Sequence, residues 1–134
     1  MAMPNAALAA RIRTEILERP EHYDQGSWVS GDVLRPEEDL TAAAHCETTL
    51  CVAGYAAHFT GHIVLPIGYA VRPGEEQEHQ IREVARTELG LTEAEAAWLF
   101  HGTRTCDEVL AALDQLADGA PRIDIAAAAA VQGV

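Results

Sequence analysis

The sequence predicts a mostly α-helical protein: a compact bundle of five or six short helices with one short β-like edge segment near 62–72. Three observations support this class: apolar residues recur at helical spacing, capping residues precede several of these stretches, and glycines follow them. The 134 residues are 49% hydrophobic, enough for one buried core. We expect a single helical domain over 1–120 and an Ala-rich C-terminal tail over 121–134.

The first helix is expected over 6–18. Leu8, Ile12 and Ile16 recur every fourth residue and therefore share one face. Asn5 comes just before this helix and is a preferred N-terminal capping residue.

A long irregular connection is expected over 20–47, because glycines and prolines interrupt it repeatedly. Within it, 36–44 begins with proline followed by acids, which suits the first turn of a short helix. Connections of this length inside one domain are uncommon and are often functional.

A helix over 48–60, ending at Gly61, is expected to be the central one. Cys51, Tyr55 and His58 lie on its apolar arc. The segment 62–72 that follows is β-like, but its proline and glycine restrict it to an edge strand or an extended loop.

Three more helices are expected in the second half of the chain, each followed by a glycine. They cover 75–89, the stretch from Thr92 to Gly102, and the stretch from Thr105 to Gly119. Capping boxes are expected at two of their starts, where Thr92 pairs with Glu95 and Thr105 pairs with Glu108.

Composition narrows the classes of function. Asp and Glu number 21 against 9 Lys and Arg, so the formal net charge is −12. We expect no binding to a nucleic-acid backbone, which requires a basic surface. No segment has the pattern of a signal peptide or a membrane-spanning helix, so we expect a cytoplasmic protein that binds no membrane. Three cysteines, an odd number, argue against a disulfide framework.

The densest group of reactive side chains comprises His45, Cys46, Cys51, His58 and His62. Thiolates and imidazoles are the usual zinc ligands, so the last four of these residues are metal-site candidates, with zinc as the alternative to no cofactor. Their spacing matches no strong zinc pattern. Cys51 and His58 also fit a second interpretation as core residues, because both lie among apolar neighbours.

Cys46 and His45 are also candidates for catalysis. A thiol near a helix N-terminus can act as a nucleophile, with His45, His62 or His101 as its base. Glu47 opposes this hypothesis, because a neighbouring negative charge disfavours the thiolate. Whether the protein is an enzyme stays open.

Acidic and aromatic residues offer two further hypotheses. Most acids fall on polar helix faces, where they either contact only water or form a surface for a basic partner. Charge reversal at Glu93, Glu95 or Glu108 would test that surface. Aromatic residues in irregular segments either anchor the chain to the core or line a ligand groove. The candidate ligand-binding residues are Cys51, His58, Trp28, Tyr55 and Tyr69.

The run from Cys46 to Ala56 reads Cys-Glu-Thr-Thr-Leu-Cys-Val-Ala-Gly-Tyr-Ala. It resembles a motif of small uncharacterised proteins of actinobacteria and their phages, Cys-Gly-Thr-x-x-Cys-[Val/Ile]-Ala-Gly-[Trp/Tyr]-Ala. The stretches 20–28 and 89–100 resemble the same group's flanking segments, whereas Glu47 stands where that group is expected to have glycine. The resemblance implies a small soluble domain of phage or mobile-element origin, with no established activity.

The sequence thus predicts a small acidic cytoplasmic module that acts by binding a partner protein, with a homodimer as one option. The alternative is a small-ligand, metal or cysteine-based catalytic site built around Cys46, Cys51 and His58.

Overall fold

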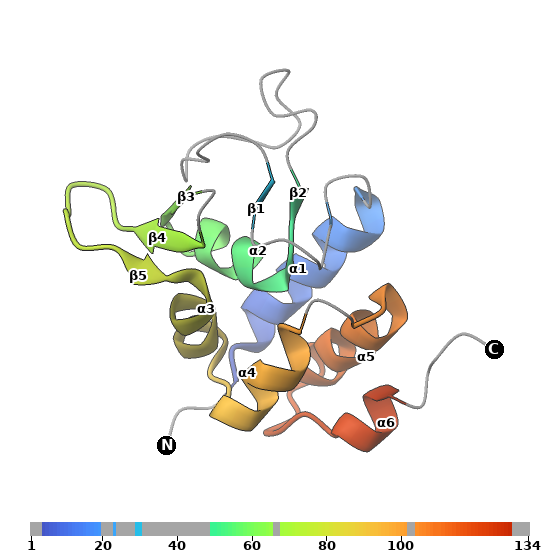
Figure 1. Cartoon of the computed structure of the whole chain (residues 1–134). Helices are drawn as coiled ribbons and strands as arrows, with labels where there is room; N and C mark the ends of the chain where they lie inside the picture. Colours follow the sequence, from blue (N-terminus) through green and yellow to red (C-terminus); the bar gives the residue numbers. More distant parts are fainter. Residues whose placement is uncertain are drawn as a thin grey trace.

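The computed structural model describes residues 4–19, 23, 29–30, 49–65, 68–101 and 104–129. Six helices lie in this part of the chain (Figure 1): α1 (Ala6–Glu18), α2 (Val52–Phe59), α3 (Ile81–Leu89), α4 (Glu93–Leu99), α5 (Cys106–Ala117) and α6 (Ile125–Ala129). The same residues include five short strands: β1 (Val29–Ser30), β2 (Thr49–Leu50), β3 (Ile63–Leu65), β4 (Tyr69–Val71) and β5 (His79–Gln80). The mostly α-helical class is therefore confirmed. The helix expected over 36–44 lies outside the described residues.

One hydrophobic core joins the helices. Helix α1 packs against α5, and α2 packs against α3. The repeated apolar residues of α1 are buried in this core, as their spacing predicts. Every residue from Val52 to His58 is buried. A helix that is buried on all sides is surrounded by other elements, so α2 is the central helix, as expected.

The predicted helix caps are present. The N–H of Leu8 donates a hydrogen bond to Oδ1 of Asn5 at 3.0 Å. The two predicted capping boxes both form, at the starts of α4 and α5. Helix α3 ends at Gly90, whose φ of 74° is the left-handed conformation that favours glycine.

Two of the predicted helices begin later than expected. The helix predicted over 48–60 begins at Val52, because the residues of β2 pair with β1. The helix predicted over 75–89 begins at Ile81, because the residues of β5 pair with β4. Both predictions are wrong at their first residues, since helical spacing within one segment does not reveal a strand partner elsewhere in the chain.

The segment predicted to be β-like contributes to a small antiparallel sheet, in the order β3-β4-β5. Gly68, with φ 89°, lies in the turn between β3 and β4. In Figure 1 the loop that joins β4 to β5 extends away from the helices. Strands β4 and β5 and their loop therefore project from the helical body (Figure 1).

The described part of the Ala-rich tail packs on the same core. Helix α6 lies against α5, and Ile123 and Ala128 are buried. The N–H of Ile123 donates a 2.7 Å hydrogen bond to Oε2 of Glu95, which joins the tail to α4. None of the described helices has the length and hydrophobicity needed to cross a membrane.

Candidate functional site

Helix α2 buries two of the residues that the sequence singled out. Tyr55 is fully buried and His58 is 7% exposed. Each of their rings lies close to the Phe59 ring, with centroid separations of 5.6 Å for Tyr55 and 5.5 Å for His58. The guanidinium of Arg11 lies 4.0 Å from the centroid of the same Phe59 ring. Tyr55 and His58 are therefore part of the packed interior, and the contact between Arg11 and Phe59 joins α1 to α2.

Cys51 is buried at the start of α2, where its Sγ accepts a 3.4 Å hydrogen bond from the N–H of Gly54. This position favours the interpretation of Cys51 as a core and capping residue. Cys106, in contrast, is exposed at the start of α5. Desolvation and the negative charge of Asp107 raise the pKa of the Cys106 thiol, which disfavours the reactive thiolate.

Three predicted site residues, Trp28, His45 and Cys46, lie outside the described residues. Within the part of the chain that is described, no three His, Cys, Asp or Glu side chains form a group that could hold a metal ion. The zinc and catalytic hypotheses that depend on Cys46 stay predictions.

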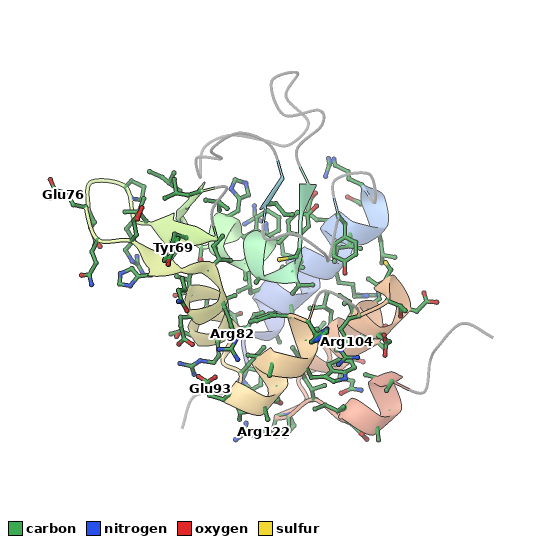
Figure 2. All side chains as sticks on the ribbon, in the orientation of Figure 1. Tyr69, Glu76, Arg82, Glu93, Arg104 and Arg122 are labelled. Atoms are coloured by element: carbon green, nitrogen blue, oxygen red, sulfur yellow. The ribbon has the colours of Figure 1, made fainter. Side chains whose placement is uncertain are left out.

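Tyr69 lies on the β4–β5 hairpin (residues 69–80), most of which is exposed. Tyr69 is 36% exposed, and every residue from 72 to 80 is exposed. Figure 2 shows Tyr69 at the base of the hairpin and Glu76 at its outer end. Glu75, Glu76 and Glu78 form no ion pair with another described residue.

Two acids on the helices next to this hairpin are already paired. Glu83 and Glu93 form ion pairs with Arg82 and Arg86, at nitrogen–oxygen distances of 3.0 to 3.2 Å. Arg82 and Glu93 lie close together between α3 and α4 in Figure 2. The charges of these four side chains therefore compensate one another.

Two other predicted members of the acidic surface are buried. Glu95 is 4% exposed and Glu108 is 2% exposed. Each carboxylate accepts a 2.8 Å hydrogen bond from the backbone N–H of its capping threonine. The prediction that Glu95 and Glu108 belong to an accessible acidic surface is wrong, because the N-terminal N–H groups of a helix need acceptors.

A pocket of about 240 Å³ lies between the hairpin and α3. It is lined by His62, Arg72, His79, Glu83, Val84, Thr87 and Glu88. The last four residues share one face of α3, because two adjacent residues are followed by two more one helical turn later. The sequence predicted only His62 as a site residue here.

His62 is 3% exposed and has a defined hydrogen-bond arrangement. Its Nδ1 lies 3.2 Å from Oγ1 of Thr60, and that hydroxyl donates its proton to the Ala56 carbonyl at 2.7 Å. Burial, and next the charge of Arg72, lower the pKa of His62, while Glu88 opposes them. Burial and Arg72 thus favour the neutral form of the His62 ring.

In the sequence, the polar residues of α3 were the pattern that could have pointed to the α3 side of this pocket. Glu83, Thr87 and Glu88 lie on that side, beside the buried Val84. Arg72 and His79 carried no such signal, because only the pairing of β4 with β5 brings them against α3.

Neither a protein-family model, nor a curated protein, nor a solved structure matches the chain. Function is therefore inferred from the geometry of the described residues.

Proposed function

We propose that this protein is a small acidic interaction module that acts in the cytoplasm by binding a basic surface of a partner protein through the β4–β5 hairpin. One observation carries the proposal: the three hairpin acids, Glu75, Glu76 and Glu78, are exposed and form no ion pair with another described residue. The resemblance of the Cys46–Ala56 run supports an origin in a phage or another mobile element.

Charge and position both support this assignment. Glu83 of α3 and Glu93 of α4 are compensated by Arg82 and Arg86, whereas the hairpin acids are directed to solvent. A net charge of −12 attracts a basic partner over several ångströms and speeds their encounter. Tyr69 adds an exposed aromatic ring at the base of the hairpin, and tyrosine is enriched in protein interfaces.

The test compares two variants that change the net charge equally. Glu76→Lys with Glu78→Lys reverses two hairpin acids. Glu18→Lys with Asp118→Lys, the helical-acid variant, reverses two exposed acids at the C-terminal ends of α1 and α5. Each purified variant and the unmodified protein are used to capture proteins from a lysate of the host cells. The affinity of any captured protein is then measured with purified components at low and high salt.

We expect the unmodified protein and the helical-acid variant to capture the same protein. The hairpin variant is expected to bind it at least about tenfold more weakly, and added salt to weaken the unmodified complex. Equal binding by the hairpin variant, equal losses in both variants, or no captured protein would each contradict the proposal.

A further inference from the structure

The pocket between the hairpin and α3 is lined by two opposite charges that form no ion pair within the described part of the chain. Arg72, which follows β4, and Glu88, on α3, both line it. Neither forms an ion pair with another described residue, so they lie more than 4 Å from each other. His62 lines the same pocket, so the two charges lie around one space. A molecule with one negative and one positive group would complement both.

Glu83, the second carboxylate of the pocket, is already paired and cannot receive a cationic ligand group in the same way. Glu83 accepts from Arg82 at 3.2 Å and from Arg86 at 3.0 Å. Its charge is already compensated by these two guanidinium groups. Glu88 is therefore the acid of this pocket that can receive a cationic group.

The remaining lining residues set the size and polarity of an occupant. A volume of about 240 Å³ is below the range of roughly 300–1,000 Å³ of most ligand pockets, so only a compact molecule fits. Val84 provides an apolar wall, and the hydroxyl of Thr87 and the imidazole of His62 provide hydrogen-bonding groups.

We propose that this pocket binds a compact zwitterion of the α-amino acid class, with its carboxylate at Arg72 and its ammonium group at Glu88. A guanidinium matches a carboxylate with two parallel hydrogen bonds, and a carboxylate is the natural acceptor for an ammonium group. The small side chain of the ligand contacts Val84. This site does not rest on the proposed function, because none of the three hairpin acids lines it.

The test uses L-alanine and two analogues that each lack one charge. L-alaninamide has no carboxylate, and N-acetyl-L-alanine has no ammonium group. Binding to the full chain is followed by calorimetry and by NMR shifts of Val84 and Thr87. We expect saturable binding of L-alanine and at least about tenfold weaker binding of either analogue, since hydrogen bonds between charged groups are strong.

Two variants assign the charges to their residues. Arg72→Gln should bind L-alanine at least about tenfold more weakly and should no longer distinguish it from L-alaninamide. Glu88→Gln should no longer distinguish L-alanine from N-acetyl-L-alanine. Glu18→Gln, on α1 and outside the pocket, should bind like the unmodified protein. Arg72→Lys, which keeps the positive charge, should retain the preference for a ligand with a carboxylate and shows that loss of binding is not loss of fold.

Three results would overturn the proposal. The first is the absence of saturable shifts at Val84 and Thr87 with L-alanine. The second is equal affinity for L-alanine and either analogue in the unmodified protein. The third is an unchanged preference among the three probes in both Arg72→Gln and Glu88→Gln.

Discussion

Helix α2 and the β4–β5 hairpin follow each other in the chain with β3 between them, and they differ almost completely in exposure. Every residue from Val52 to His58 is buried, whereas every residue from 72 to 80 is exposed. The helix holds two of the residues that the sequence singled out, Tyr55 and His58. The hairpin holds three exposed glutamates, Glu75, Glu76 and Glu78. Access to solvent therefore separates the two regions more sharply than the chemistry of their side chains.

The physical reason lies in their neighbours. Helix α2 contacts α1, α3 and β3, and small residues such as Ala53 and Ala56 allow this close packing. Buried groups of this helix, such as Tyr55 and His58, are therefore packing residues. The hairpin is covered by no helix on its outer end, so its charges are available to another molecule (Figure 1). Pairs of matched substitutions, one in each environment, test this contrast.

The largest expected effect separates two tyrosines. Tyr55→Ala removes a fully buried ring and should lower the free energy of unfolding by about 3–5 kcal/mol. Tyr69→Ala removes a half-exposed ring on a strand and should cost less than about 1 kcal/mol. Urea unfolding measures both. Similar losses in the two variants would break the contrast between α2 and the hairpin.

The same contrast extends to carboxylates. Glu95→Ala leaves the N–H groups of Thr92 and Ile123 without their acceptor and should lower the free energy of unfolding by about 2–3 kcal/mol. Glu76→Ala, on the exposed hairpin, should change it by less than about 0.5 kcal/mol. Glu95→Gln should lie between them, because glutamine can still close the capping box. A tolerated Glu95→Ala would show that α6 does not depend on this contact.

A smaller difference in unfolding free energy is expected between variants of Cys51 and Cys106. Cys51→Ala removes a buried thiol and the cap of α2, and should cost about 1–3 kcal/mol of unfolding free energy. Cys106→Ala is at an exposed position and should cost less than about 0.5 kcal/mol. If Cys51→Ala kept full stability and instead abolished binding of a ligand or partner, Cys51 would be a site residue and the core interpretation would fail.

The smallest expected effect is a pH dependence of the unfolding free energy that arises from His62, which lies between α2 and β3. The pKa of His62 in the folded protein is below its ordinary value of 6.5, first through burial and then through Arg72 and His79, against the opposing charge of Glu88. Between the pKa of His62 in the folded protein and 6.5, the unfolded chain therefore binds more protons than the folded protein. The contribution of the neutral ring to stability is complete above pH 6.5 and is lost as the pH falls toward the pKa of the folded protein.

Urea unfolding between about pH 7 and pH 5 measures this dependence. His62→Gln should flatten the decrease in stability, whereas His101→Gln, at an exposed position, should leave it as in the unmodified protein. An identical pH profile in His62→Gln and the unmodified protein would contradict the assignment.

By itself the sequence determined the class of fold, most helix positions and the caps at Asn5, Thr92 and Thr105. These features depend on residues three or four positions apart, so a linear pattern contains them. Only the tertiary structure decided that β5 forms before α3, that Glu95 also holds Ile123, and that Arg72 and Glu88 line one pocket. Each of these depends on packing between segments that are distant in the chain, and no local pattern encodes that packing.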